Sequence, residues 1–395
     1  MPLKILHVSY IYPPKLKVAD GITNVVYNVT KELARRGHQV TVFTSNLADL
    51  HTTTMLPTRH YIVNGVNVFY FRYLWRYKTF MFTPSIINGL RNLDNFDIIH
   101  IHDARSFQGI CTYIWDKIKQ VPYVFQPHGS FLSSISEPYN LRMLKIYLDK
   151  LVSSKIVKNA SKIIVLSSFE ANQYKHIGIS EEKIAIIPNG IDLSEYADLP
   201  PKGSFKRKFN IPEDRKIILY LGRIHKTKGI DLLIRAYAYL KNEMKDKDTI
   251  LVIAGPDDGY LNEARTLANS LEVYNSVMFT GFISSEDKLK ALVDAEVFVT
   301  PSFYGFPVTF LEACAVGTPI VTTSLGDMLE WIDENVGYVA QPTHHDLAEA
   351  IYRIISDDEL RRRFSKNCIE IVKSEFSIEK VVEKIEKVYK DVVER

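Results

Sequence analysis

Near the middle of the chain the sequence reads Ile217-Ile218-Leu219-Tyr220-Leu221-Gly222-Arg223-Ile224-His225-Lys226-Thr227-Lys228-Gly229. Its first five residues form an uninterrupted apolar run, which predicts a strand buried on both faces. A basic loop bounded by glycines follows directly and leads into a segment with helical spacing. Strand, loop and helix in this order form the repeating unit of parallel α/β sheets.

Short apolar runs of the same kind recur along the whole chain, separated by longer segments with helical spacing. In the first half the predicted strands are Ile5–Val8, Val40–Thr44, Asp97–Ile101, Tyr123–Phe125 and Ile163–Leu166. In the second half they are Ile217–Leu221, Ile250–Ala254, Val277–Thr280, Val297–Thr300 and Ile320–Thr322. Two such sets predict an α/β protein with two Rossmann-like, doubly wound parallel-sheet domains.

The length of 395 residues is too great for one ordinary core and suits two domains. Turn signals at Pro188-Asn189-Gly190 and Pro200-Pro201 favour a boundary there, so we expect one domain over residues 1–190 and another over 191–375. The segment from Ile378 to about Arg395 has apolar residues at helical spacing. It predicts a C-terminal helix over about 376–395.

The composition is that of an ordinary globular protein, with 46% hydrophobic and 24% charged residues. A formal net charge of +3 gives no reason to expect nucleic-acid binding. The chain starts without a secretory apolar segment and has no run of about 18 apolar residues. Its three cysteines, Cys111, Cys314 and Cys368, cannot all pair and lack metal-ligand spacing. These features favour a cytoplasmic protein.

Residues 69–82 are crowded with aromatic side chains and interleaved with cations such as Arg76 and Lys78. One interpretation is a strand and loop that pack their aromatic rings into the first domain. The other is a peripheral contact with the inner face of the membrane, which would suit an acceptor carried on a lipid. Aromatic stacking with cations also suits nucleic acid, but nothing else in the chain supports that interpretation.

Open parallel sheets bind ligands beyond the carboxyl ends of their strands, so the loops there carry the candidate site residues. Gly21, before a helix expected from about Val25, lets a phosphate approach backbone N–H groups, unless it is only a flexible-loop glycine. His128 faces a ligand or is structural. His100 and His102 alternate as strand residues do, so one of them points inward, and a metal site would need a third ligand that the sequence does not show.

Two cations and a carboxylate stand out in the second half. Arg223 and Lys228 lie five residues apart in a strand-to-helix loop. They can neutralise a diphosphate without a metal ion, or they form a solvated basic loop. Glu312 lies on an otherwise apolar helix, where a carboxylate is costly unless it is paired or binds a ligand. It either accepts the hydroxyls of a ribose or forms a structural ion pair.

As a set, these segments resemble the retaining glycosyltransferases of family 4, which have the two-domain GT-B fold. The segments that carry the resemblance are Gly37-His38-Gln39-Val40-Thr41-Val42, Ile187-Pro188-Asn189-Gly190-Ile191-Asp192, Leu221-Gly222-Arg223 with Lys228-Gly229, Ile253-Ala254-Gly255, Phe279-Thr280-Gly281-Phe282 and Leu311-Glu312-Ala313. The resemblance implies two domains facing a central cleft, with the C-terminal helix crossing back to the first. It also implies transfer of a sugar from a UDP- or GDP-sugar to a hydroxyl of a glycan or lipid-linked acceptor, with retention and without metal or other cofactor.

The same resemblance implies roles for individual residues. Arg223 and Lys228 would bind the donor diphosphate and act in catalysis, Glu312 would bind the ribose, and His128 would face the donor sugar. Further donor-binding positions implied in this way are Gly21, Gly222, Gly281, Phe282, Tyr304, Pro307, Val308 and Thr309.

The chain departs from the family at one position. The family motif has two glutamates separated by seven residues, and counting back eight from Glu312 gives Tyr304. The loop Ser302-Phe303-Tyr304-Gly305-Phe306 is either one residue short or substituted. The missing glutamate usually lies against the donor sugar, and a tyrosine cannot act as a carboxylate base at neutral pH. Two alternatives therefore stay open: a sugar-nucleotide epimerase of the same fold, and a non-catalytic protein that binds nucleotide-sugars.

Overall fold

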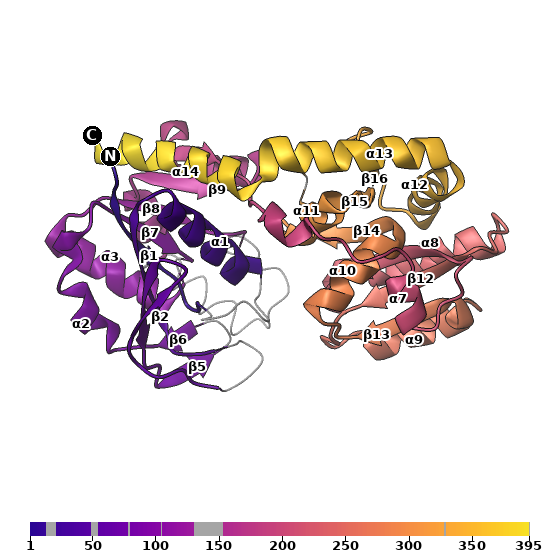
Figure 1. Cartoon of the computed structure of the whole chain (residues 1–395), viewed down its shortest axis with the longest axis horizontal. Coiled ribbons are helices and arrows are strands. Elements are labelled where there is room, and N and C mark those ends of the chain that lie inside the picture. Colours follow the sequence, from indigo (N-terminus) through magenta and orange to yellow (C-terminus); the bar gives the residue numbers. More distant parts are fainter. Residues whose placement is uncertain are drawn as a thin grey trace. The chain divides into compact units, whose positions relative to one another are not determined.

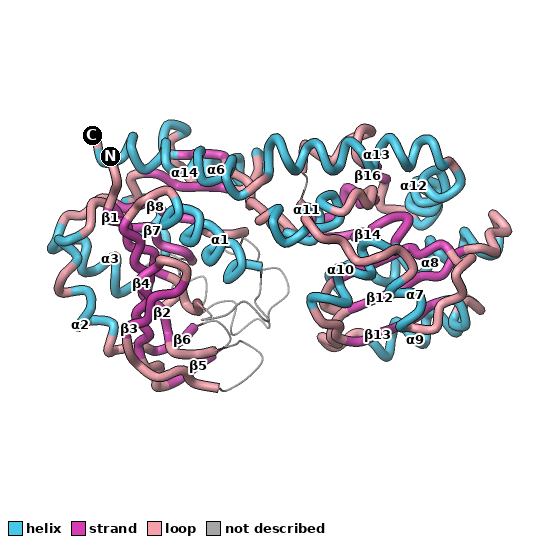
Figure 2. The backbone as a smooth tube through the Cα atoms, in the orientation of Figure 1, coloured by secondary structure: helices cyan, strands magenta, loops and turns pink. Residues whose placement is uncertain are grey.

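Figure 1 shows the computed structural model of the protein, which describes residues 1–12, 21–48, 54–77, 80–103, 105–129, 153–327 and 329–394. The chain divides into two compact units: Met1–Gly190 with Ile378–Arg395, and Ile191–Ser377. In each unit helices pack against a sheet that is mostly or wholly parallel (Figure 2). The prediction of an α/β protein with two doubly wound sheets is therefore confirmed.

The first unit is built on an eight-stranded sheet with the order β10-β9-β8-β7-β1-β2-β4-β3. Its neighbouring strands run parallel, except that β3 is antiparallel to β4. The central strands β1, β7 and β8 are almost wholly buried, as continuous apolar runs require. The strands are β1 (Lys4–Val8), β2 (Gln39–Ser45), β3 (His60–Val63), β4 (Val66–Phe71), β7 (Ile98–His102), β8 (Tyr123–Gln126), β9 (Lys162–Val165) and β10 (Ile184–Ile186).

Helices from both ends of the sequence complete the first unit. The described ones are α1 (Gly21–Arg35), α2 (Ile86–Leu90), α3 (Phe107–Lys119), α5 (Ser154–Asn159), α6 (Ser168–His176) and α14 (Ile378–Val393). The last helix, α14, buries an apolar face beside α1 and β7 (Figure 1). Its Glu386 pairs with Arg36 at 2.9 Å and with His38 at 2.8 Å, which fixes the helix at the end of α1.

The second unit is built on a six-stranded, wholly parallel sheet with the order β13-β12-β11-β14-β15-β16. The strands are β11 (Lys216–Leu221), β12 (Thr249–Ala254), β13 (Val277–Gly281), β14 (Ala295–Phe303), β15 (Ile320–Gly326) and β16 (Gly337–Ala340). The helices are α7 (Ser204–Lys208), α8 (Ile230–Asn242), α9 (Leu261–Ser270), α10 (Ser285–Asp294), α11 (Val308–Ala315), α12 (His344–Ser356) and α13 (Asp358–Ile371). A core of β-branched and aromatic side chains joins β11, β12 and β14 to α8, α9 and α12.

All ten predicted strands are present, but two of them, β14 and β15, continue well past the predicted ends at Thr300 and Thr322. Strand β14 continues past Thr300 to Phe303, because Ser302 and Phe303 pair with Leu325 and Gly326 after a shift in register. Pro301 lies at that shift, where the missing N–H of a proline is tolerated. The loop that leads to α11 therefore begins at Tyr304.

Other differences have equally local causes. Helix α1 begins at Gly21 and not at about Val25, with Thr23 already buried in its first turn. Among the unpredicted strands, β3, β10 and β16 have only three or four residues each and are partly exposed, so their sequences lack a buried run. Strand β4 has six residues, but its buried and partly exposed side chains alternate. The thiols of Cys111, Cys314 and Cys368 are buried and unpaired. No helix in the described parts of the chain combines the length and apolarity needed to cross a bilayer.

Candidate active site

Three glycine loops meet at the carboxyl edge of the second unit's sheet. The Gly222 N–H donates to the Ala254 carbonyl at 3.0 Å, and the Gly255 N–H donates to the Gly281 carbonyl at 2.9 Å. A Cβ on Gly255 would lie 1.8 Å from the Gly222 carbonyl oxygen, so only glycine permits this approach. The ends of β11, β12 and β13 are thereby held side by side.

Arg223 follows Gly222 in the first of these loops. The Tyr220 hydroxyl donates to the Arg223 carbonyl at 2.9 Å, which fixes the backbone there. The guanidinium forms an ion pair with Asp258, and the two side chains are 60% and 42% exposed. Exposed ion pairs contribute only about 0–1 kcal/mol to stability. Arg223 can therefore leave Asp258 and bind an anionic ligand at little cost.

Lys228 closes the short 3₁₀ turn η5 (Lys226–Lys228) and precedes α8. The next residue, Gly229, has φ 68° and packs against Pro301, so the basic loop lies beside the end of β14. Burial and the neighbouring Arg223 lower the pKa of Lys228, whereas Asp327 raises it. A partly desolvated ammonium interacts more strongly with an anion than a fully hydrated one.

Asp327 lies directly after β15 and contacts the loop before α11. Its Oδ2 accepts the Gly305 N–H at 2.5 Å. Burial raises the pKa of Asp327, while the Gly305 hydrogen bond and Lys228 oppose that shift. Tyr304, the residue before Gly305, is 45% exposed. A carboxylate from β15 therefore lies within the influence of Lys228 and beside the loop in which Tyr304 stands.

Glu312 lies on α11 and is buried, with 6% of its surface exposed. Its Oε1 accepts a hydrogen bond from the Lys288 ammonium at 2.6 Å, and its Oε2 has no partner among the described residues. Burial, followed by the Glu312 carboxylate, raises the pKa of the nearby Tyr196 phenol. Glu312 thus forms an ion pair and still offers one buried oxygen to a ligand, and an unpaired buried acceptor is costly without one.

The other predicted donor-binding residues of this unit lie at loop and helix ends. Pro307 precedes α11, and Val308 and Thr309 begin it; this first turn carries no acidic residue and no side-chain cap. Unpaired N–H groups of a helix N-terminus attract anions. Gly281 ends β13 with φ 68°, and Phe282 after it is 63% exposed. Together with Arg223, Lys228 and Glu312, these residues follow the carboxyl ends of parallel strands.

In the first unit, Gly21 is the first residue of α1 and is exposed; residues 13–20, which precede it, lie outside the described residues. His128 follows β8 with a φ of 53°, unusual for a residue with a side chain. The buried Glu170 supports this loop, since its carboxylate accepts the Gly129 N–H at 3.1 Å and the Leu166 N–H at 2.8 Å. Strained backbone that the surroundings hold firmly is common at functional sites.

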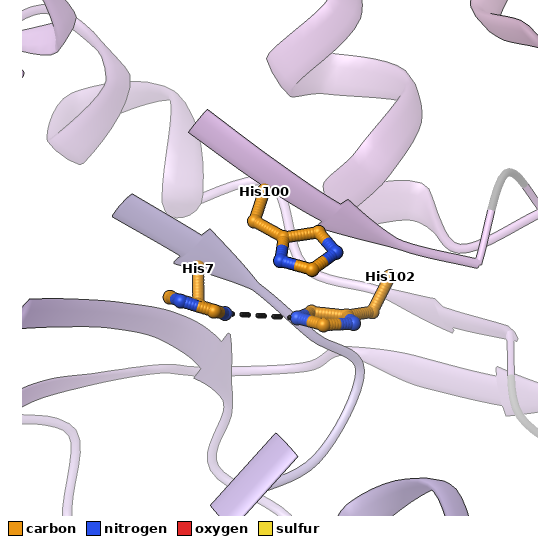
Figure 3. A group of neighbouring side chains, drawn as sticks. All are labelled: His7, His100 and His102. Atoms are coloured by element: carbon orange, nitrogen blue, oxygen red, sulfur yellow. Dashed lines mark hydrogen bonds between the residues drawn. The ribbon is translucent and has the colours of Figure 1, made fainter. Parts of the chain in front are cut away.

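The prediction that only one of the two histidines of β7 points inward is wrong. Both His100 and His102 are fully buried, because residues two apart on a strand share a face. His7 of β1 pairs in register with His100 and joins them (Figure 3). Ring nitrogens of the three lie within 4.8 Å of one another, so the third histidine that the sequence did not show is supplied by the neighbouring strand.

The aromatic stretch over residues 69–82 has a buried part and an exposed part, and contact with a membrane stays a prediction. Tyr70, Tyr73 and Met81 are buried and pack within the first unit. The hairpin of β5 (Trp75–Tyr77) and β6 (Phe80–Phe82) turns its other rings outward, with Trp75 56% and Phe82 39% exposed. Lys78 and Thr79 lie outside the described residues.

Several residues of the site had no recognisable signal in the sequence. Lys288 lies 24 positions before its partner Glu312, and Asp258 lies 35 positions after Arg223. His7 is separated from His100 by 93 positions. Only the parallel pairing of distant strands brings such residues together. The roles of the predicted site residues remain predictions.

Comparison with known proteins agrees with this architecture. Residues 201–371 match the family described as Glycosyl transferases group 1, and residues 19–195 match Glycosyltransferase Family 4. An uncharacterised glycosyltransferase of Methanocaldococcus jannaschii is 29% identical, over 99% of both chains. The N-acetyl-alpha-D-glucosaminyl L-malate synthase of Bacillus anthracis is 24% identical over 92% of both, and the phosphatidyl-myo-inositol mannosyltransferase of Mycolicibacterium smegmatis is 24% identical over 90% of this chain and 86% of that one.

Solved structures share the fold over nearly the whole chain. The sucrose-phosphate synthase of Thermosynechococcus elongatus superposes with a TM-score of 0.72 and 23% identity, covering 98% of both chains. Anabaena HepE in complex with UDP-glucose superposes with a TM-score of 0.73 and 18% identity, covering 98% of this chain and all of that one (100%). The two family matches lie in the two units, and the chain therefore belongs to the family 4 type of GT-B glycosyltransferases.

Proposed function

We propose that this glycosyltransferase moves a sugar from a UDP- or GDP-sugar to a hydroxyl of a glycan or lipid-linked acceptor, with retention and without a metal ion. The observation that carries the proposal is the placement of Arg223, Lys228 and the half-paired Glu312 beyond the carboxyl ends of β11 and β14. Ligands of open α/β sheets bind at that edge. HepE, which has the same fold, was crystallised with UDP and with UDP-glucose.

The diphosphate is the part of the donor that this edge fits best. Arg223 offers a forked donor and Lys228 a partly desolvated charge, while Val308 and Thr309 begin a helix with unpaired N–H groups. Two cations and a helix N-terminus can offset the charge of a diphosphate, which supports transfer without a metal. Gly21 at the start of α1 would add backbone N–H groups.

The nucleoside would extend away from the diphosphate. Glu312 Oε2 is the acceptor for a ribose hydroxyl, and the nearby Tyr196 and Lys288 hold the carboxylate in a fixed environment. The loop of Gly281 and Phe282 would meet the base, since Phe282 presents an exposed ring. His128 of the first unit would face the donor sugar.

In the proposed reaction the acceptor oxygen attacks the anomeric carbon from the face that the diphosphate leaves. The bond from that carbon to the phosphate oxygen breaks, its electron pair stays on the diphosphate, and the leaving phosphate takes the proton of the acceptor hydroxyl. Arg223 and Lys228 stabilise the negative charge that grows on the diphosphate. No side-chain nucleophile is required, so Tyr304 at the usual glutamate position is compatible with transfer.

The donor is tested directly by a thermal-shift screen of the wild-type protein against UDP-, GDP- and ADP-sugars, because a ligand that binds the folded state raises its apparent stability. A donor that stabilises the protein is then incubated with and without candidate acceptors. Release of the nucleoside diphosphate with formation of a glycoside of retained configuration supports the proposal. Conversion of the donor without any acceptor would instead identify an epimerase.

A lipid-linked acceptor is supported by the exposed hairpin and by the relative named phosphatidyl-myo-inositol mannosyltransferase. Leu74, Trp75 and Phe82 are 61%, 56% and 39% exposed, and Trp suits a membrane–water boundary. We expect co-sedimentation with vesicles of anionic phospholipid, consistent with a cytoplasmic protein held on the inner face. A Leu74→Ser/Trp75→Ala double variant should no longer co-sediment with the vesicles. The control variant Tyr274→Ala, in the second unit, should still co-sediment. Wild-type protein that stays in solution would exclude the membrane contact.

A further inference from the structure

A chain of imidazole rings runs through the first unit from the loop after β8 to the C-terminal helix. His7, His100, His102 and Tyr389 are all fully buried, and they come from β1, β7 and α14. His128 extends this series into the loop after β8, where its own backbone has a positive φ of 53°. Buried histidine rings need hydrogen-bond partners, and these four adjoining rings supply one another with them.

Hydrogen bonds join the rings end to end. His128 Nε2 lies 2.8 Å from His102 Nδ1. His102 Nε2 lies 2.9 Å from His7 Nδ1 (Figure 3). His7 Nε2 lies 3.4 Å from the Tyr389 hydroxyl, which in turn lies 2.7 Å from His100 Nδ1. Two buried nitrogens have no partner among the described residues: His128 Nδ1 at one end and His100 Nε2 at the other.

The geometry favours this series over a metal site, although His7, His100 and His102 have nitrogens within 4.8 Å of one another. The facing nitrogens of His7 and His102 hydrogen-bond to each other. His100 stacks on His102, with ring centroids 4.1 Å apart and 29° between the planes, and it turns its Nδ1 to Tyr389. Stacked rings do not direct their nitrogens at one tetrahedral centre.

Only two distributions of the ring protons satisfy every hydrogen bond of the series. Burial holds the pKa of each of the four histidines well below its ordinary value, so every ring is neutral near pH 7 and carries one N–H. If all four protons are on Nε2, each bond is made but the His100 Nε2–H donor is left buried and unpaired. If all four are on Nδ1, each bond is also made, and the unpaired groups are the Nδ1–H donor of His128 and a lone pair of His100. Each arrangement therefore leaves one buried donor unpaired. The first leaves it on the fully buried His100, and the second leaves it on His128 in the loop after β8, where the ligand of the proposed function would accept it. Buried N–H groups are rarely left without a partner, which favours the second arrangement.

We propose that His102 and His7, with Tyr389 and His100 beyond them, are positioning residues that hold His128 with its proton on Nδ1. His128 thereby presents an N–H donor to an oxygen of the sugar-nucleotide donor. The identity of that ligand rests on the proposed function, whereas the tautomer of His128 is a property of the protein by itself. Helix α14, through Tyr389, thus helps to set the tautomer of His128 in the loop after β8.

Nuclear magnetic resonance tests this on the full chain with ¹⁵N-labelled histidine, because two-bond nitrogen–proton correlations distinguish the two tautomers. The His128 signal is assigned by its loss in His128→Gln. Two variants are compared with wild type: His102→Asn, whose amide can still donate from the position of Nδ1, and His102→Leu, which cannot donate. Transfer kinetics, thermal unfolding and zinc content are measured on the same samples.

We expect an Nδ1–H tautomer at His128 in wild type and in His102→Asn, and a mixed or Nε2–H state in His102→Leu. The kcat of His102→Leu should fall about 10- to 100-fold with little change in the KM for the donor, as when the outer partner of a functional histidine is lost. An Nε2–H tautomer in wild type, an unchanged tautomer in His102→Leu, or one equivalent of bound zinc would each overturn the proposal. Absence of transfer in wild type with the expected tautomers would refute the proposed function and leave this inference standing.

Discussion

Lys288 donates to one oxygen of the Glu312 carboxylate at 2.6 Å and leaves the other oxygen without a partner among the described residues. The pair joins α10 to α11, two helices that follow the carboxyl edge of the same sheet. An ion pair that served only stability would satisfy both oxygens, since an unpaired buried acceptor costs about 1–3 kcal/mol. The free oxygen is therefore the feature of this site that most directly indicates a ligand with a hydroxyl group.

The first prediction concerns that oxygen. Glu312→Gln should weaken binding of the nucleotide donor about 10- to 100-fold, because a hydrogen bond to a charged group contributes about 1.5–3 kcal/mol. Calorimetry with the nucleoside diphosphate measures the change. Glu296→Gln is the matched control: Glu296 is also buried and ion-paired, with Arg361 at 2.9 Å, but lies at the amino end of β14. Equal loss of affinity in both variants would contradict a ribose contact at Glu312.

The second prediction concerns the basic loop after β11. Arg223→Ala or Lys228→Ala should lower kcat about 10²–10³-fold, by analogy with the loss of one donor that stabilises developing negative charge. Lys226→Ala removes the same charge from the same turn and should retain transfer, because Lys226 has no assigned contact with the donor. Steady-state release of the nucleoside diphosphate gives the comparison. Near-normal turnover in both Arg223→Ala and Lys228→Ala would exclude these residues from catalysis.

The sequence predicted the fold well because the fold depends on local patterns. Strands such as β11 and β12 are continuous apolar runs after their first residue, and such runs specify a strand buried on both faces without reference to the rest of the chain. The pairing of Lys288 with Glu312 and the alignment of His7 with His100 depend instead on which strands become neighbours. Short, partly exposed strands such as β16 gain their stability from pairing, so no pattern marks them in advance.

The third prediction concerns the partner of Arg223. Asp258 forms an ion pair with the guanidinium of Arg223, and both side chains are substantially exposed. Asp258→Asn should therefore strengthen binding of the nucleoside diphosphate by up to about fivefold at low salt, since breaking an exposed pair costs about 0–1 kcal/mol. The gain should shrink as the salt concentration rises. Weaker binding in this variant would show that Asp258 orients Arg223 and does not compete for it.

The fourth prediction concerns pH and the buried histidines. Burial lowers the pKa of His7 to about 3 in the folded protein, against 6.5 for the exposed side chain. Between these values the unfolded chain binds more protons, so this contribution to stability is complete above pH 6.5 and is lost as the pH falls. At pH 5 the loss for His7 is about 2 kcal/mol. Urea unfolding at pH 5, 6 and 7 should show a smaller pH dependence in His7→Gln than in wild type, and parallel curves would contradict a neutral buried ring.

The last prediction concerns the loop in which Tyr304 stands at the position counted for the family's first glutamate. Asp327 places a carboxylate beside this loop, where it accepts the Gly305 N–H and raises the pKa of Lys228. Asp327→Asn keeps an acceptor for Gly305 and removes only the charge. If that charge acts on the donor sugar, kcat should fall about tenfold or more, whereas the nucleoside diphosphate should bind as tightly or more tightly, because a like charge has been removed from beside it. A purely structural Asp327 would leave kcat unchanged in Asp327→Asn and would lower it only in Asp327→Ala, which also loses the Gly305 hydrogen bond.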